Sequence, residues 1–404
     1  MKEFSVFLNH LGDSNLVGTL AKKDQRIFFE YDSRFIKQNI SISPYSMPLQ
    51  PELREFKNHS YSDIFGAIND SLPDGWGLLL MDRYLKQLGQ NFKGLTSFER
   101  LSYIARQGMG ALEFSPSGFA IDRKQEEINL YEMSKNAIDI FEGHSDYVIS
   151  KLAKAGGSPG GARPKIIVTE KASGKFVTDE GVYDEDDQHW LIKFDVSKEF
   201  KNFSKVEYAY SLLAKSCAIE MPETKLFKDQ KGNEYFGIKR FDRSDAFKVH
   251  THTFGSLVES NFRIPDQDYK NLILVAIDLT KDVKEAYKIF RLMVFNHLVT
   301  NQDDHVKNFS FIMDANFRWK FAPAYDLTPS FGMNNWQSMT INNKGVNILE
   351  SDYLEVIQGS GLDKKICLSI IEEVKEGVSA FNTLDLDLEN SDRKRLIDDY
   401  IRIK

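Results

Sequence analysis

Apolar residues recur at helical spacing just before the most polar short stretch of the chain. This spacing is typical of an amphipathic helix, and it is shown by Ala286, Tyr287, Phe290, Val294, Phe295 and Leu298. Two strand-like runs follow at 309–313 and 317–321, and the polar residues 314–316 between them indicate a hairpin turn. The pattern therefore predicts a helix, a polar junction and a hairpin, in that order.

The polar junction resembles the catalytic segment of protein kinases. In that segment an Asp accepts the proton of the substrate hydroxyl, an Asn follows five residues later, and a later Asp holds Mg²⁺. Asp303 and Asn308 have this spacing, and Asp326 follows the hairpin. We predict Asp303 as the catalytic base and Asn308 and Asp326 as metal ligands, because a hard cation prefers oxygen. No HRD triplet precedes Asp303 and no DFG follows it, so the match is to a divergent kinase.

Other interpretations of the junction stay open. The polar residues could form a solvated loop, or Asp303, Asp304 and His305 could serve a metallohydrolase. The second is disfavoured because adjacent residues rarely converge on one ion. Asp304 ranks second to Asp303 as the base. Lys307 is a candidate for neutralising charge on the transferred phosphoryl group.

A glycine-rich stretch lies well upstream, at residues 156–165. Its glycines leave backbone N–H groups able to face a phosphate, and they are Gly156, Gly157, Gly160 and Gly161. The Walker A pattern fails because Ala162 stands where its Lys would be. In isolation the stretch is more typical of a flexible surface turn.

The alternating run 189–194 predicts a strand that carries Lys193 opposite Trp190, and kinases place their phosphate-pairing Lys on such a strand. The following helix starts near Ser204 and offers Glu207 as a partner for Lys193. Ser204 and Glu207 also fit a capping box, so Glu207 could act only as a cap. Lys239 and Phe241, near a hinge-like exit from the next hairpin, are further candidates for ATP binding.

Composition and net charge limit the class of protein and the cellular compartment that we expect. The 404 residues include 42% hydrophobic residues, enough for two or three domains or lobes, and the net charge of −7 argues against bulk-charge binding of nucleic acid. The two cysteines, Cys217 and Cys367, lack metal-ligand spacing and indicate buried thiols in a reducing cytoplasm. The chain shows neither a signal-peptide core nor an apolar run long enough for a membrane span.

The order of these motifs over residues 150–330 is that of a kinase, and their details resemble the HipA family of toxin-antitoxin serine/threonine kinases. The resemblance rests on the stretches 158–165 (SPGGARPK), 241–243 (FDR), 302–309 (QDDHVKNF) and 325–326 (YD), with 71–76 (SLPDGW) and 108–112 (GMGAL) upstream. It implies an α+β, divergent two-lobed kinase-like fold with an α/β amino-terminal subdomain. The expected ranges are 1–115 for that subdomain, 140–243 for the amino-terminal lobe and 244–404 for a mostly helical lobe.

The resemblance also implies a function. Such proteins use ATP and Mg²⁺ and are neutralised by a HipB-like helix-turn-helix antitoxin that binds DNA. Some members phosphorylate aminoacyl-tRNA synthetases. They inactivate themselves by phosphorylating a Ser in the glycine loop, and Ser158 stands at that position. Arg163 and Pro159 depart from the family pattern. A small-molecule kinase of the aminoglycoside-kinase type and a pseudokinase binding module remain as alternatives.

Overall fold

A computed structural model describes residues 2–89, 95–117, 124–156, 160–179, 183–244, 246–384 and 386–402. The chain folds into two compact units. The first unit comprises Met1–Val196, Phe227–His252 and Ser256–Glu259, and the second comprises Ser197–Leu226, Thr253–Gly255 and Ser260–Lys404. The division into 1–115, 140–243 and 244–404 stays a prediction.

The first unit begins with a five-stranded antiparallel sheet of order β4-β3-β2-β1-β5. Its strands are β1 (Lys2–His10), β2 (Asp13–Lys23), β3 (Arg26–Tyr31), β4 (Arg54–Glu55) and β5 (Leu112–Ser115). Leu11 and Gly12 join β1 to β2 with φ angles of 50° and 90°, the left-handed pair that a tight hairpin requires.

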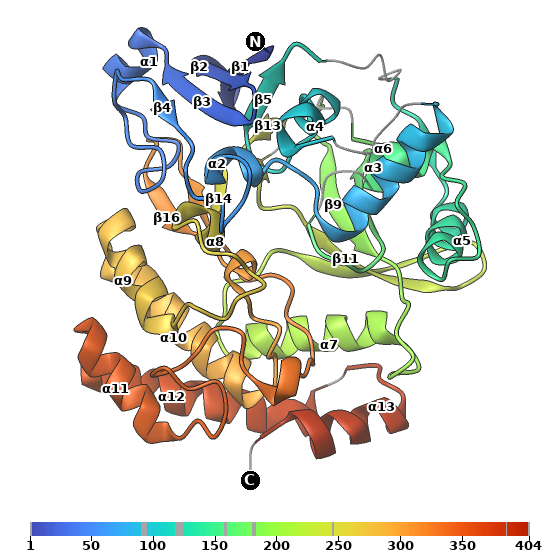
Figure 1. Cartoon of the computed structure of the whole chain (residues 1–404). Coiled ribbons are helices and arrows are strands. Elements are labelled where there is room, and N and C mark those ends of the chain that lie inside the picture. Colours follow the sequence, from blue (N-terminus) through green and yellow to red (C-terminus); the bar gives the residue numbers. More distant parts are fainter. Residues whose placement is uncertain are drawn as a thin grey trace. The chain divides into compact units, whose positions relative to one another are not determined.

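A second sheet of the chain has the order β10-β11-β9-β7-β8-β6. Its strands β9 and β11 are labelled in Figure 1. Its strands are β6 (Glu127–Ile128), β7 (Lys165–Glu170), β8 (Phe176–Thr178), β9 (Gln188–Lys193), β10 (Thr224–Lys228) and β11 (Glu234–Lys239). Helices α3 (Gly75–Gln87), α5 (Leu130–Phe141) and α6 (Ser150–Gly156) supply apolar side chains to its core. Trp190, Ile192 and Phe194 are buried together in that core, which confirms the predicted strand face.

The second unit is mainly helical. Its long helices are α7 (Phe203–Ser216), α9 (Tyr269–Thr280), α10 (Val283–Leu298), α11 (Glu350–Ser360) and α12 (Lys364–Ser379). Helix α10 packs against α9 and α12, and its apolar face is buried as the sequence pattern predicts. The predicted hairpin is also present, as β15 (Ser310–Met313) and β16 (Trp319–Phe321).

Shorter elements complete the described chain. They are α1 (Ser33–Gln38), α2 (Gly66–Asn69), α4 (Ser97–Ile104), β12 (Arg243–Ser244), β13 (Phe247–Lys248), β14 (Thr251–Thr253), α8 (Phe254–Leu257), α13 (Asn390–Arg395), the 3-10 turns Val306–Asn308, Met333–Asn335 and Ala380–Thr383, and the π-helical turn Leu396–Tyr400.

The predicted capping box of Ser204 and Glu207 is wrong. Asn202 caps α7 instead, because its side-chain oxygen accepts a hydrogen bond of 3.0 Å from the backbone N–H of Lys205. Glu207 therefore lies beyond the first turn of the helix, and it is buried. A buried carboxylate needs a polar or charged partner, so Glu207 remains the predicted partner of Lys193.

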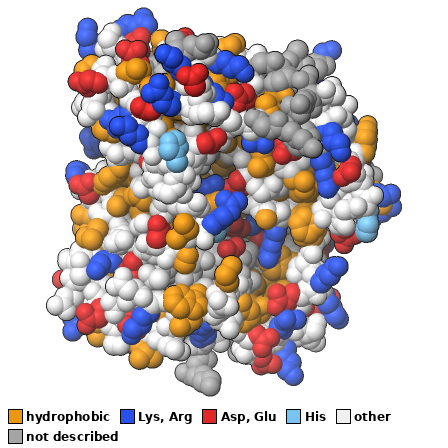
Figure 2. Space-filling view, in the orientation of Figure 1, with side chains coloured by type: hydrophobic (Ala, Val, Ile, Leu, Met, Phe, Trp, Pro, Cys, Tyr) orange, Lys and Arg blue, Asp and Glu red, His pale blue; other side chains and the backbone are white. Residues whose placement is uncertain are grey.

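The surface charges are mixed and the two cysteines are buried, as the composition predicts. Acidic and basic side chains are interspersed over the face shown in Figure 2, as expected for a modest net charge of −7. Cys217 and Cys367 are buried free thiols, and burial raises the pKa of Cys217 to about 11. Within the part of the chain that the structure describes, no helix has the length and apolar character needed to cross a bilayer.

Candidate active site

Asp303 and Asn308 lie in one short turn of the second unit, directly after α10. The turn contains a 3-10 segment over Val306–Asn308, which folds the chain back on itself. As a result, the Asn308 side-chain amide donates a hydrogen bond of 2.7 Å to the backbone oxygen of Asp303. The Asp303 backbone N–H donates to Ser330 Oγ at 3.2 Å, and the residue is exposed. The five-residue spacing thus has a structural basis: it lets the amide brace the backbone that carries the carboxylate.

Asp304 is turned the opposite way, into the interior. Its carboxylate accepts hydrogen bonds from Tyr269 (2.5 Å), from the Gln337 side chain (2.8 Å) and from the backbone N–H groups of Ser338 (3.1 Å) and Met339 (3.2 Å). Burial raises the pKa of Asp304 to about 7. With four donors around it, this carboxylate fixes α9 and the segment 337–339 to the turn at 303–308.

The metallohydrolase alternative does not fit this arrangement. The Asp304 carboxylate is buried and already accepts four hydrogen bonds, whereas the side chain of the neighbouring Asp303 is exposed. Among the described residues, no group of three or more His, Cys, Asp or Glu side chains is placed to hold a metal ion. The predicted metal ligands Asn308 and Asp326 would offer oxygen atoms, which suit Mg²⁺ better than zinc, and their role stays a prediction.

Tyr325 connects the turn at 303–308 to the segment after the hairpin. Its hydroxyl donates to the backbone oxygen of Lys307 at 2.7 Å and lies 2.6 Å from Ser310 Oγ. The next residue, Asp326, has a φ of 56°, a left-handed conformation that Asp tolerates better than most residues. The structure therefore joins Lys307 and the segment carrying Asp326 through one side chain. The Lys307 ammonium lies 4.8 Å from the centroid of the Phe262 ring.

The glycine loop belongs to the first unit and is described in part. Gly156 ends α6, while Gly157 and Ser158 lie outside the described residues. Gly160 and Gly161 are described, and the Lys165 ammonium donates to Gly160 O at 2.7 Å. Sequence reasoning missed Asp74 here, although its carboxylate accepts a hydrogen bond from Gly161 N–H. The Pro-Asp-Gly sequence at the start of α3 is typical of a turn, and it was the sequence feature that could have drawn attention to Asp74.

Lys193 is the last residue of β9 and is buried. It pairs with Phe236 of β11, and its ammonium lies 5.7 Å from the centroid of that ring. The predicted partner Glu207 belongs to the other compact unit, so their ion pair stays a prediction. Lys239 ends β11 and Phe241 follows two residues later, and their part in nucleotide binding also stays a prediction.

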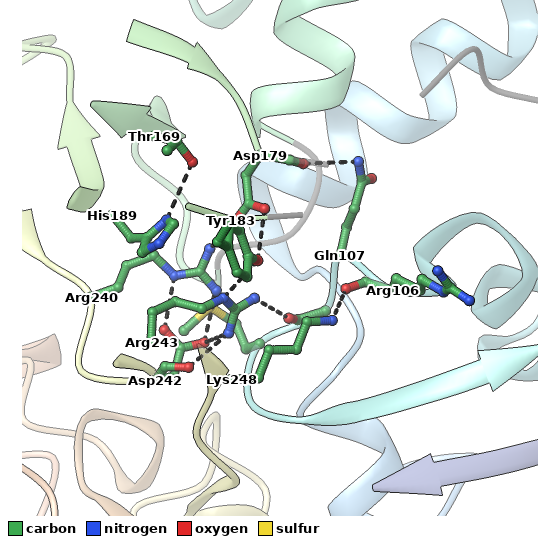
Figure 3. A network of polar contacts seen from close by, with 12 residues as sticks. Arg106, Gln107, Thr169, Asp179, Tyr183, His189, Arg240, Asp242, Arg243 and Lys248 are labelled. Atoms are coloured by element: carbon green, nitrogen blue, oxygen red, sulfur yellow. Dashed lines mark hydrogen bonds and ion pairs between the residues drawn. The ribbon is translucent and has the colours of Figure 1, made fainter. Parts of the chain in front are cut away.

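A network of buried charged side chains surrounds Asp242 (Figure 3). The Asp242 carboxylate accepts two hydrogen bonds of 2.8 Å from Arg240, one of 2.9 Å from Arg243 and one of 2.9 Å from the backbone N–H of Gly110. Although burial acts in the opposite direction, the two guanidinium groups hold the pKa of Asp242 well below its usual range. Arg240 also donates to Asp179 at 2.8 Å.

The same network reaches the glycine turn that precedes β5. Arg243 donates to the backbone oxygens of Gly110 (3.2 Å) and Gly108 (3.3 Å), and Lys248 donates to Glu113 at 2.8 Å. Burial, followed by repulsion from Arg243, lowers the pKa of Lys248 to about 8. Hydrogen bonds from backbone and charged groups therefore join two stretches that are far apart in sequence, 108–112 and 241–243. Both stretches belong to the family resemblance.

Comparison with known proteins places this arrangement in a family. The HipA N-terminal domain matches residues 8–115, and the HipA-like C-terminal domain matches residues 157–381. HipA of Shewanella oneidensis MR-1, solved as a complex with HipB and its operator DNA, has the same fold with a TM-score of 0.70 at 16% identity, over 97% of this chain and 94% of that one. The expected α+β kinase-like fold is confirmed.

Two curated relatives are more limited matches. "Putative kinase Y4dM" of Sinorhizobium fredii is 27% identical over 153 residues, which is 34% of this chain and 36% of that protein. A "Putative kinase" of Haemophilus influenzae is 27% identical over 145 residues, 32% of this chain and 42% of that protein. The chain thus matches less than half the length of either relative. The two domain matches, by contrast, together span most of the sequence, and the chain belongs to the HipA family.

Proposed function

We propose that this protein is an ATP- and Mg²⁺-dependent serine/threonine protein kinase, the toxin of a HipA–HipB type toxin-antitoxin system. The observation that carries the proposal is the turn in which Asn308 braces the backbone of an exposed Asp303 at 2.7 Å. A general base must be reachable by a substrate hydroxyl, and Asp303 meets that condition whereas the enclosed Asp304 does not.

In this proposal the second unit supplies the chemistry. Asp303 orients the attacking hydroxyl and accepts its proton, and Lys307 neutralises charge on the phosphoryl group. Asn308 and Asp326 would hold Mg²⁺, which would offset charge on the phosphates. The oxygen-rich donor set of these residues fits that ion.

The first unit supplies nucleotide contacts. Lys193 would pair with the α- and β-phosphates, with Glu207 of the second unit as its proposed ion-pair partner. Backbone N–H groups of the glycine loop at Gly156, Gly157 and Gly160 would face the phosphates. The N–H of Gly161, predicted with them, donates to Asp74, so Gly161 would contribute by holding the loop. Lys239 and Phe241 would contact the nucleotide beyond the end of β11.

The family assignment supports a proposal for the partner and the substrate. The Shewanella HipA structure contains HipB and operator DNA. We propose a HipB-like helix-turn-helix antitoxin as the partner here, with DNA contacted mainly through it. The proposed substrate is a cytoplasmic protein of translation, such as an aminoacyl-tRNA synthetase.

Replacing Asp326 tests the metal assignment. We expect Asp326→Ala to weaken Mg-ATP binding by more than tenfold in a calorimetric titration, because a charged oxygen ligand is lost. Asp278→Ala is the matched control, since Asp278 is an exposed carboxylate of the same unit that pairs with Lys281 at 2.7 Å. Equal affinities for wild type and Asp326→Ala would place the metal elsewhere.

Ser158 is proposed as a site of self-inactivation. A phosphoserine adds a charge of about −1.5 to −2, which would repel the phosphates of ATP beside the glycine loop. After incubation with Mg-ATP, mass spectrometry should find phosphate on Ser158 in wild type and none there in Asp303→Asn protein. The phosphorylated form should bind ATP more weakly. An unmodified Ser158, or unchanged affinity after modification, would contradict the switch.

A further inference from the structure

Three residues at the start of α3 hold the described part of the glycine loop. We call Asp74, Gly75 and Trp76 the DGW turn. Gly161 N–H donates to the Asp74 carboxylate, and Trp76 N–H donates back to Gly161 O at 2.9 Å. The Trp76 indole N–H adds a bond of 2.9 Å to the backbone oxygen of Lys165. The DGW turn therefore holds both polar groups of the Gly161 backbone, although Asp74 and Gly161 are 87 positions apart in the chain.

The contact is close enough to require glycine. Gly75 has a φ of 44°, and a Cβ at this position would lie 2.5 Å from Gly161 O and 2.7 Å from its carbonyl carbon. Neither backbone atom can move aside without moving the loop. Any larger residue at position 75 would therefore push the DGW turn and the loop apart.

Asp74 is the N-cap residue of α3, yet it makes no side-chain capping bond to that helix. An Asp at this position usually accepts a hydrogen bond from the second or third helical N–H. Here one carboxylate oxygen accepts from Gly161, while Gly160 also lies close enough that a Cβ on it would be 3.2 Å from the same oxygen. The Asp74 carboxylate therefore bonds to the glycine loop and not to the first turn of α3.

We propose that Asp74 is a positioning residue for nucleotide binding, acting by fixing the Gly161 backbone. The inference rests on the proposed ATP site. With the Gly161 peptide held, the N–H group of the adjacent Gly160 has fewer orientations to lose when a phosphate binds. Such preorganisation lowers the ordering cost of binding and leaves the chemical step unaffected.

Steady-state kinetics with four variants test the proposal. Asp74→Ala and Gly75→Ala should each raise KM for ATP about tenfold with kcat changed less than twofold, because a charge-assisted hydrogen bond or the close contact is lost. Asp74→Asn should restore most of the affinity, since its amide oxygen still accepts from Gly161. Asp82→Ala should match wild type: Asp82 lies on the same helix but pairs with Arg100 at 3.2 Å.

Hydrogen exchange of the peptide covering residues 160–165 gives a readout without ATP. Exchange should be faster in Asp74→Ala and Gly75→Ala than in wild type and in Asp82→Ala. Unchanged KM in both loop variants, while wild type binds ATP, would overturn this inference alone. Tighter ATP binding by Asp74→Asn would also overturn it, because the carboxylate would then compete with phosphate. Wild type that binds no ATP would contradict the proposed function as well, and exchange would still report whether the contact exists.

Discussion

Asp303→Asn is expected to lower the rate of phosphoryl transfer by a factor of about 10² to 10⁴ while ATP affinity stays within about twofold. Asparagine keeps the size of the side chain but cannot accept the hydroxyl proton. Asn308 donates to the backbone of Asp303, so the turn itself should survive the substitution. Single-turnover transfer from radiolabelled ATP measures the chemical step directly.

The control is Asp278→Asn, an equivalent change at an exposed carboxylate of α9 in the same unit. It should transfer phosphate at the wild-type rate. A wild-type rate in Asp303→Asn would contradict the assignment of the base. A rate loss explained entirely by weaker ATP binding would do the same, because Asp303 would then act on the nucleotide.

Asp242→Asn is expected to lower the free energy of unfolding by about 3–5 kcal/mol. The carboxylate is buried between Arg240 and Arg243 and accepts from both at 2.8–2.9 Å. Removing the negative charge leaves the two buried guanidinium groups without a carboxylate to balance their positive charges. The NH₂ group of the new amide would also point at guanidinium N–H groups, which are donors themselves. Urea unfolding should show a lower midpoint.

The matched control for this effect is an exposed ion pair. Asp184 accepts from Lys171 at 3.1 Å, and its side chain is 81% exposed. Asp184→Asn should change the unfolding free energy by less than about 1 kcal/mol, since water screens such a pair. A loss below about 1 kcal/mol for Asp242→Asn would mean that the network adds little to stability.

Periodicity predicted the local elements that carry the candidate site. The face of α10, the β15–β16 hairpin and the strand bearing Lys193 are all fixed by alternation or helical spacing, which depend on neighbours in sequence. The capping of α7 was missed because Asn202 and Ser204 are both good capping residues two positions apart.

Partners distant in sequence could not be predicted in this way. The adjacent residues Asp303 and Asp304 have identical side chains, and only the fold separates an exposed carboxylate from one enclosed by four donors. Likewise, the bond from Gly110 N–H to Asp242 spans 132 positions. Periodicity shows which face a residue occupies but not what lies against it.

The most direct test of the proposed function is transfer of the γ-phosphate from radiolabelled Mg-ATP by the wild-type chain. The assay offers three acceptors: the protein itself, a cell-extract protein mixture and a panel of small hydroxyl compounds. We predict Mg²⁺-dependent label on protein serine or threonine, with the transfer rate lowered by a factor of about 10² to 10⁴ in Asp303→Asn. Label found only on small hydroxyl compounds, or ATP bound without turnover, would contradict a protein kinase.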